Sequence, residues 1–309
     1  MYKHVTVLLD EAIKQLQIKP DGIYVDCTLG GGGHASAILE KLDTGHLYAF
    51  DQDDFAIEKA RERLSKVGDN FTIIKSNFSA LKSELRDRDV SHVDGVLYDL
   101  GVSSFHFDIP DRGFSYHLEA ELDMRMDQSQ AVSALHIIND YDSYELMRIF
   151  SKYGEITYSK RLAEAIVRYR EQKRIETTME FVDVILNAAP GAVRRKGHPA
   201  KQVFQAIRIA VNNELEVFEN SLKSSLEILN KGGRTVVISF HSLEDRIAKK
   251  TFKKAVEVDL PRGLPIKDAD IIVDFKLITR KPLLPTAEEI EENIRARSAK
   301  MRVIEKIRI

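Results

Sequence analysis

The sequence predicts an α/β fold in which a Rossmann-like, mostly parallel sheet is interrupted by a helical insertion. Strand-like and helix-like segments alternate from residue 23 to residue 99, which is typical of βαβ units. The alternation then stops, and it resumes towards the C-terminus. We therefore expect a discontinuous sheet domain over residues 1–104 and 205–309, with a helical insertion over residues 105–204.

The first elements surround a turn of four glycines. Residues 23–27 have the apolar, β-branched and aromatic bias of a buried strand, and Gly30 to Gly33 follow. A helix to about Leu42 and a strand ending in Asp51 complete a βαβ unit. Glycine lets a ligand approach the backbone, and an acid about 20 residues beyond the glycines can bind two ribose hydroxyls. The alternatives are a glycine turn without a ligand and Asp51 as a helix cap.

Two side chains indicate which nucleoside ligand this unit would take. The pattern Gly30-x-Gly32-x-x-Ala35 fits the relaxed dinucleotide fingerprint. Asp26, however, ends the first strand, where it would repel a pyrophosphate and attract a cation. His34 occupies the start of the helix, where dinucleotide sites keep small residues. S-adenosylmethionine carries a sulfonium and no phosphate, so it fits this turn better than a nicotinamide dinucleotide.

The remaining elements follow in order along the chain. We expect helices over residues 54–66, 79–88, 143–150, 158–172, 178–188, 202–229 and 243–255, and strands over residues 71–74, 93–99, 231–240, 275–279 and 301–307. Ligands of open α/β sheets bind beyond the carboxyl ends of the strands. That rule selects residues 26–34, Asp51, residues 77–78, residues 99–104 and residues 239–242.

Several of these positions have a structural alternative. Phe78 is either a core residue or a ring that stacks on adenine, and Asp99 could cap a turn. Ser242-Leu-Glu-Asp245 fits a capping box, so Ser242 is predicted to be structural. His241 lies beside it at a strand end and could face the substrate. Cys27 is predicted to be a core residue and not a nucleophile.

Composition bounds the class of protein. The 309 residues are 43% hydrophobic and 30% charged, with a net charge of −2, which is ordinary for a soluble globular protein. No apolar run is long enough for a membrane span, and residues 1–7 lack the apolar core of a signal peptide. Cys27 is the only cysteine, so we expect a cytoplasmic protein without an intrachain disulfide.

Motifs spread over nearly the whole chain resemble those of one enzyme family. The chain resembles the RsmH (MraW) family of methyltransferases that act on 16S ribosomal RNA. The matching segments lie at residues 4–11, 26–34, 99–104, 112–116, 122–127, 153–155, 198–200, 204–209, 212–215, 239–246 and 295–298. Leu122-Asp-Met-Arg-Met-Asp127 and Ser239-Phe-His-Ser-Leu-Glu-Asp-Arg246 are the most specific.

The resemblance implies a class I S-adenosylmethionine-dependent methyltransferase with an inserted substrate-recognition domain. It implies methyl transfer to the N4 amine of a cytidine in 16S ribosomal RNA, near the decoding centre, with S-adenosylhomocysteine as product and the small ribosomal subunit as partner. The sequence leaves open whether the protein forms a homodimer. By motif position, the cofactor contacts would be Gly32, Gly33, His34, Asp51, Phe78 and Asp99.

The turn after the fourth strand departs from the family pattern. The family usually continues Gly-Val-Ser-Ser with Pro-Gln-Leu-Asp, and this chain has Phe105-His106-Phe107-Asp108. His106 therefore stands where the family has a glutamine of the cofactor site. Its ring nitrogens can still form hydrogen bonds, although their reach differs from that of a glutamine amide.

The chemistry of amine methylation suggests which residues act. A cytosine amine is a poor nucleophile, so orientation and well-placed acceptors are the main contributions of a protein. The catalytic candidates are Asp99, Ser103, Ser104 and His241. A non-catalytic nucleoside-binding protein associated with RNA or ribosomes is one alternative. A DNA-amine methyltransferase is another, but it would normally carry an Asx-Pro-Pro-aromatic turn where this chain has Asp99-Leu-Gly-Val.

A basic loop at the end of the insertion is the candidate RNA surface. The residues with this expected role are Arg194, Arg195, Lys196, His198, Lys201 and Arg208. Their charge could bind substrate phosphates, or the loop could simply be solvated. Phe114, Tyr116 and Tyr153 could stack on an unstacked base. In the acidic run over residues 119–127 we expect ion pairs with Arg125 and no metal.

Overall fold

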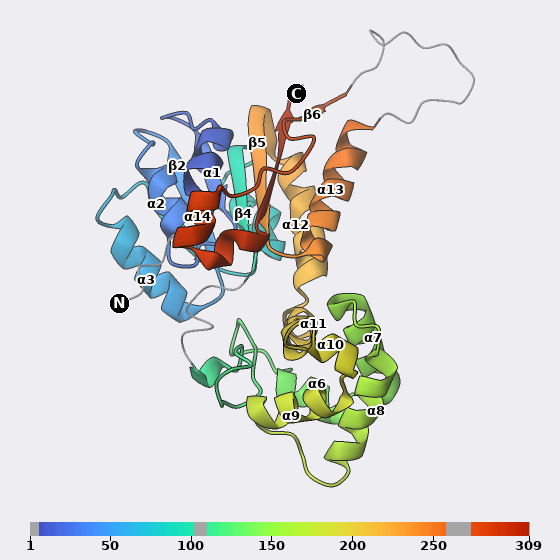
Figure 1. Ribbon diagram of the computed structural model, residues 1–309. Coiled ribbons are helices and arrows are strands. Elements are labelled where there is room, and N and C mark those ends of the chain that lie inside the picture. The colour runs from blue at the N-terminus through green and yellow to red at the C-terminus, as the bar shows by residue number, and fades with distance from the viewer. Residues whose placement is uncertain (1–5, 102–109, 258–272, 309) are drawn as a thin grey trace, which may run out of the picture. The chain divides into compact units, whose positions relative to one another are not determined.

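The computed structural model describes residues 6–101, 110–257 and 273–308. The chain divides into two compact units, residues 1–101 with 215–309, and residues 102–214 (Figure 1). The second boundary therefore lies after Glu214, whereas the sequence suggested residue 204. The reason is that residues 200–212 bury their apolar side chains, among them Val203, Phe204 and Ile207, in the core of the second unit.

The first unit is built on a seven-stranded sheet with the order β3-β2-β1-β4-β5-β7-β6. Its strands are β1 (Ile23–Asp26), β2 (His46–Asp51), β3 (Phe71–Lys75), β4 (Val93–Asp99), β5 (Leu229–Ser239), β6 (Phe275–Leu277) and β7 (Lys300–Lys306). Strands β1 to β5 are paired in parallel, and β7 runs antiparallel to both β5 and β6. The predicted α/β fold class is confirmed.

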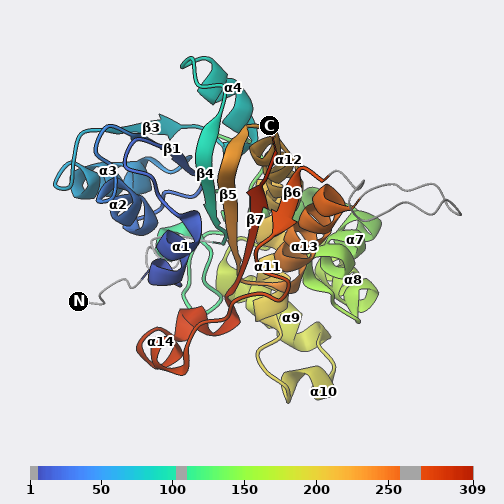
Figure 2. The same ribbon diagram turned by 90° about the horizontal axis from the view of Figure 1, so that it is seen from above.

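Alternate side chains of each strand enter two separate cores. Tyr24 of β1 and Leu97 of β4 pack on one face with α1 (Leu9–Leu16), α2 (Gly33–Leu39) and α3 (Asp54–Leu64). Val25 and Tyr98, their chain neighbours, pack on the other face with α4 (Leu81–Arg86), α12 (Glu214–Glu227) and α13 (Ser242–Val256). This two-fold alternation is what a sheet covered by helices on both faces requires, and Figure 2 shows those helices flanking the strands. Helix α14 (Ala287–Glu292) follows β6.

The second unit is helical among the residues described. Its elements are α6 (Ala134–Asp140), α7 (Ser143–Gly154), α8 (Ser159–Arg170), α9 (Thr178–Ala188), α10 (Gly191–Arg194) and α11 (Ala200–Asn212). All of them except α10 contribute to a core that includes the fully buried residues Phe150 and Phe181. The only strand-like pairing that the described part of this unit shows is an isolated bridge between Glu121 and Thr177.

One expected helix is in fact two. The sequence predicted a single helix over residues 202–229, but α11 ends at Asn212 and α12 begins at Glu214. Between them Asn213 adopts a left-handed conformation with a φ of 49°, which asparagine tolerates better than most residues. Helix α1 was not predicted, because it is only eight residues long and lies between left-handed Leu8 and Gln17. Within the described ranges, no helix is long and apolar enough to cross a membrane.

Candidate functional site

Three neighbouring parallel strands end in carboxylates at the same edge of the sheet. Asp26 ends β1, Asp51 ends β2 and Asp99 ends β4, and β1 lies between the other two. Asp26 is paired with Ala49 of β2 and with Leu97 of β4, so Asp51 and Asp99 lie further along their strands. The structure thus brings together the acids that the sequence selected separately.

Asp51 holds the glycine turn in place. Its Oδ2 accepts a hydrogen bond of 2.8 Å from the backbone N–H of Gly30. Its Oδ1 accepts from the backbone N–H groups of Gln52 and Asp53, at 2.8 and 3.0 Å. Asp51 therefore shapes the turn through its hydrogen bonds to the backbone. Its expected contact with ribose hydroxyls stays a prediction.

The glycines of the turn serve different purposes. Gly30 has a φ of +47° and Gly32 a φ of +73°, which favour residues without a Cβ. A Cβ on Gly32 would lie 3.3 Å from Cβ of Ala60, and one on Gly33 only 2.0 Å from Oγ1 of Thr6. Among the described residues, a Cβ on Gly30 would meet only the carbonyl of Thr28, at 3.9 Å. Gly32 and Gly33 thus allow close packing of Ala60 and Thr6, whereas the described chain leaves space beside Gly30.

Behind the edge lies a buried cluster of charged side chains, formed by Asp26, His34 and Asp99. Asp26 is 1% exposed and His34 is 4% exposed, while the side chain of Asp99 is 25% exposed. Nδ1 of His34 is 3.5 Å from Oδ2 of Asp99. Oδ2 of Asp26 and Oδ1 of Asp99 are buried without a hydrogen-bond partner among the described residues.

The protonation of this cluster reflects its burial. Burial raises the pKa of Asp26 to about 6, although the charge of His34 partly opposes that shift. Burial by itself would lower the pKa of His34, but the hydrogen bond and charge of Asp99, together with the charge of Asp26, leave that pKa raised. Negative charge therefore exceeds positive charge here once the carboxyls ionise, which favours a cationic ligand.

Thr28 joins the strands that carry these acids. The sequence analysis included it within residues 26–34 but gave it no role of its own. Its hydroxyl accepts a hydrogen bond of 2.7 Å from the backbone N–H of Asp99. Its own backbone N–H donates to Oδ1 of Asp26 at 3.0 Å. The spacing Asp-x-Thr at a strand end is the signal that could have identified this link, because aspartate side chains accept from the backbone two residues on.

Two other predicted residues are in structural contacts. The ring of Phe78, in a short 3-10 helix (Phe78–Ala80), packs edge-on against Tyr98 with centroids 5.8 Å apart. His241 is the N-cap of α13 and forms a capping box with Glu244, so the box begins one residue before the predicted Ser242. Nε2 of His241 is also 3.1 Å from Oε1 of Glu244. His241 therefore has an evident role in ending β5 and starting α13.

Three candidates cannot be placed. Ser103, Ser104 and His106 lie outside the described residues, as does Phe105. The described part of this segment ends at Gly101, whose φ is +113°. Their expected roles beside Asp99 stay predictions.

In the second unit, most of the basic candidates are exposed together. Arg194 ends α10, and Arg195, Lys196, His198 and Lys201 are exposed between α10 and the first turn of α11. Arg208 differs from them. Its Nε and NH2 groups each donate to Glu214 at 2.9 Å, and its side chain is 13% exposed. Arg208 is therefore a structural ion pair near the end of α11 rather than part of the exposed group.

A set of aromatic rings lies beside this loop. Tyr116 stacks on His198 with centroids 5.1 Å apart and planes 28° apart, and His117 contacts both rings. Phe114, in contrast, is buried in the helical core, so it is unsuited to stack on a base. In the acidic run, Asp123 binds Arg125 through two hydrogen bonds of 2.7 and 2.9 Å, which is the expected ion pairing.

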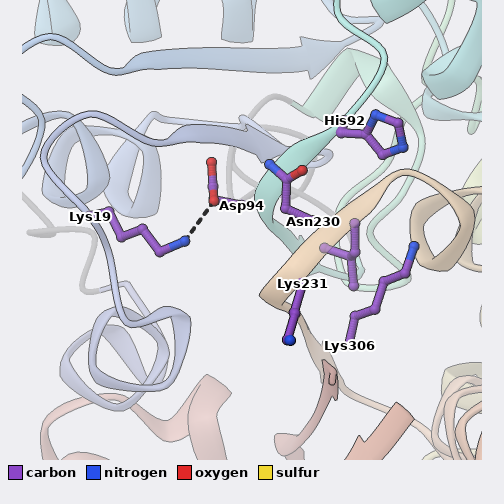
Figure 3. Close-up of a pocket in the computed structure, with 7 residues that line it drawn as sticks. Lys19, His92, Asp94, Asn230, Lys231 and Lys306 are labelled. Carbon is purple, nitrogen blue, oxygen red and sulfur yellow. Dashed lines mark hydrogen bonds and ion pairs between the residues drawn. The ribbon is translucent and has the colours of Figure 1, made fainter. Parts of the chain in front are cut away.

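A separate basic groove lies at the opposite edge of the sheet (Figure 3). It has a volume of about 440 Å³ and is lined by Lys19, His92, Asp94, Leu229, Asn230, Lys231 and Lys306. These residues surround the start of β4 and β5 and the end of β7. Lys19 is held there by Asp94 at 2.9 Å. Because parallel α/β sheets bind ligands at their carboxyl edge, the groove is distinct from the cofactor site.

The residues at the carboxyl edge fit S-adenosylmethionine. Asp51 carries a carboxylate suited to ribose hydroxyls, the described residues leave the backbone at Gly30 open to close approach, and Phe78 is a partly buried ring shortly after β3. Among the described residues, the buried oxygens Oδ2 of Asp26 and Oδ1 of Asp99 lack hydrogen-bond partners, which suits a ligand with a sulfonium and an ammonium group. When bound, such a cofactor supplies an electrophilic methyl group.

The chain is similar to known proteins over nearly its whole length. The model of the MraW methylase family matches residues 1–307. Among solved structures, the chain is similar to a ribosomal RNA methylase from Streptococcus thermophilus, with 12% identity and a TM-score of 0.45 over 99% of this chain and 100% of that one. It is also similar to a Streptococcus mutans protein in complex with S-adenosylhomocysteine, with 13% identity and a TM-score of 0.44 over 98% and 99% of the two chains.

The family match extends over both units, so it includes the sheet, the glycine turn, the three strand-end acids and the helical insertion. The chain therefore belongs to the MraW methylase family and is an S-adenosylmethionine-dependent methyltransferase with a class I, Rossmann-like fold.

Proposed function

We propose that this methyltransferase modifies the N4 amine of a cytidine in 16S ribosomal RNA, near the decoding centre. The observation that carries the proposal is Asp99 at the end of β4. Its Oδ1 is buried and lacks a partner among the described residues, while its Oδ2 faces His34. An acceptor that is free in this way suits an N–H group of the substrate amine.

The chemistry of an exocyclic amine explains why such an acceptor matters. The nitrogen lone pair of cytosine is delocalised into the ring, so the amine is a weak nucleophile. A carboxylate that accepts one amine N–H returns electron density to the nitrogen and orients it towards the methyl carbon. Thr28 accepts a hydrogen bond from the backbone N–H of Asp99, which helps to hold the end of β4 that carries this acceptor.

RNA as the substrate is supported by the second unit and by the family. The exposed group Arg194, Arg195, Lys196 and Lys201 gives local positive charge to a chain whose net charge is −2. Phosphate contacts of this kind supply affinity but not sequence specificity. The adjacent rings of Tyr116 and His198 offer surfaces on which an unstacked base can lie. We therefore assign RNA recognition to the second unit.

The test is a comparison of modified nucleosides. Small-subunit RNA from cells with and without this protein is digested, and N4-methylcytidine is mapped by mass spectrometry. We expect one cytidine near the decoding centre to lose its N4-methyl group without the protein and to regain it when the wild-type gene is restored. A strain carrying Asp99→Asn serves as the control for the presence of the folded protein.

Two outcomes would contradict the proposal. If all modified nucleosides of the small-subunit RNA are unchanged, this RNA is not the substrate. If purified protein methylates DNA amines faster than small-subunit RNA, the rival assignment as a DNA methyltransferase gains support. The turn Asp99-Leu100-Gly101, which lacks the prolines of an Asx-Pro-Pro-aromatic motif, favours RNA.

A further inference from the structure

We propose that His34 and Asp26 store, behind Asp99, the proton that methyl transfer releases, so that product-bound enzyme holds more protons than cofactor-bound enzyme. The inference rests on the proposed amine substrate for the origin of the proton, but its test needs no RNA. His34 and Asp26 act through Asp99 and are positioning residues, while Asp99 is the group that meets the amine.

The three side chains are arranged by depth. Asp99 is a quarter exposed at the end of β4, and His34 lies behind it near the start of α2 with 4% exposure. Asp26 is the deepest, with 1% exposure. Nδ1 of His34 is 3.5 Å from Oδ2 of Asp99, and catalytic hydrogen bonds are often this long without ligands. A proton can therefore enter at Asp99 and be held where water does not reach.

The charged groups that act on this cluster come from β1, β2, β4 and α2. The charges of His34, Asp99 and Asp51 act on Asp26, and the charges of Asp99 and Asp26 act on His34. Asp51 is already engaged by three backbone N–H groups, so it is not part of the store. Burial raises the pKa of Asp26 to about 6, and the neighbouring carboxylates raise that of His34, so both groups hold a proton to higher pH than they would in water.

The balance of the reaction shows why a store is useful. The amine nitrogen forms a bond to the methyl carbon, while the carbon–sulfur bond breaks and its electron pair stays on sulfur. The sulfonium charge disappears, and the nitrogen must lose one proton. A proton that passes to Asp99 replaces the positive charge that the cluster loses. Without that proton, ionised Asp26 and Asp99 would face a neutral thioether in a buried site.

Binding of the two ligands should therefore differ in proton uptake. A sulfonium near the cluster favours its deprotonated form, whereas a neutral thioether allows protonation. We expect S-adenosylhomocysteine to take up roughly half a proton more than S-adenosylmethionine near pH 7. By linkage, the affinity for S-adenosylhomocysteine relative to S-adenosylmethionine should then fall about threefold for each unit that the pH rises.

Calorimetry in two buffers measures this directly. Each ligand is titrated into the full-length protein at pH 7 in phosphate and in Tris, whose ionisation enthalpies differ, and the difference in heat gives the protons taken up. The expected result is greater uptake with S-adenosylhomocysteine. Equal uptake with both ligands would overturn the proposal, whatever the variants do.

Variants locate the proton. Asp26→Asn and His34→Asn should abolish most of the difference between the ligands, and Asp94→Asn, at the opposite end of β4, should retain it. A difference that persists unchanged in both cluster variants would overturn the proposal, because it would then arise from the amino groups of the ligands. Since these titrations contain no RNA, a failed proton store and a failed RNA assignment are distinguishable.

Discussion

At the scale of single residues, the carboxylates at the sheet edge that are predicted to bind the cofactor also stabilise the local backbone. Asp51 accepts three backbone hydrogen bonds, including one from Gly30, and is predicted to bind ribose. Asp26 is held by Thr28 on one oxygen and has its other oxygen buried without a partner in the described structure. These acids differ in burial although each ends a parallel strand, so their substitutions should have different consequences.

The role of Asp51 can be tested by its removal. Asp51→Ala should weaken S-adenosylmethionine binding by ~2 kcal/mol or more, since a charge-assisted hydrogen bond contributes roughly 1.5–3 kcal/mol and the glycine turn also loses its anchor. Calorimetry measures the affinity, and thermal unfolding checks the fold. Asp54→Ala, which removes a nearby exposed carboxylate paired with Lys75, is the matched control and should bind normally. Unchanged affinity in folded Asp51→Ala would remove this residue from the cofactor site.

The role of Asp99 is separable from cofactor binding. Asp99→Asn keeps the shape but removes the charge, so the amine loses a strong acceptor. We expect the methylation rate at saturating cofactor to fall ~100-fold, which corresponds to about 2.7 kcal/mol of transition-state stabilisation. Single-turnover assays measure this step. A defect that excess S-adenosylmethionine cures would instead make Asp99 a binding residue.

The buried carboxyl of Asp26 should lower stability at neutral pH. Burial raises its pKa in the folded protein to about 6, from an ordinary value of 3.8, so the folded state favours the protonated form. The wild type should therefore lose stability relative to Asp26→Asn as the pH rises from 3.8 to about 6. Above that window, Asp26→Asn should be more stable by about 2–3 kcal/mol.

Urea denaturation of the cofactor-free proteins at pH 5 and pH 7.5 measures this difference. If Asp26→Asn is no more stable than the wild type at pH 7.5, ionisation of Asp26 does not lower the free energy of unfolding. The comparison also indicates whether the chain retains a destabilising acid at the position where a cationic cofactor is expected.

At the scale of elements, the exposed basic residues of α10 and of the loop that follows it form one cluster of positive charge. Replacing Arg194, Arg195 and Lys196 together with alanine should weaken RNA binding and reduce its dependence on salt, because fewer counterions are released. S-adenosylmethionine affinity should not change. The matched control is the triple substitution of Lys160, Arg161 and Arg168 on α8, which removes the same number of exposed cations. If both triple variants bind RNA alike, the loop has no specific role.

At the scale of the whole molecule, the second unit has a core of its own, separate from the two cores of the sheet. Residues 102–214 should therefore fold alone into a helical domain with a cooperative thermal transition. Circular dichroism of this fragment tests it. Arg208 and Glu214 both lie within the fragment, so its last ion pair is preserved, and ending the fragment at residue 204 should abolish cooperativity because it removes most of α11. A fragment 102–214 that melts without a transition would contradict this independence.

Sequence patterns were enough to predict the parallel sheet, the glycine turn and the strand-end acids Asp26, Asp51 and Asp99. These features depend on local patterns, such as apolar runs that end in a polar residue, and the carboxyl ends of parallel strands necessarily share one edge. The expected boundaries of strand β4 and helix α9 agree with the structure for the same reason. The break at Asn213 escaped prediction because both flanking helices have continuous helical patterns.

The contacts of each of these side chains depend on tertiary packing. Thr6 and Ala60 occupy the space that a Cβ would need at Gly33 and Gly32, and Glu214 engages Arg208, which the sequence had grouped with the exposed cations. The burial of Asp26 and His34 behind Asp99 likewise arises from segments that are distant in sequence. Solvation and the distance between charges set their protonation, and both depend on packing, which residue order alone does not specify.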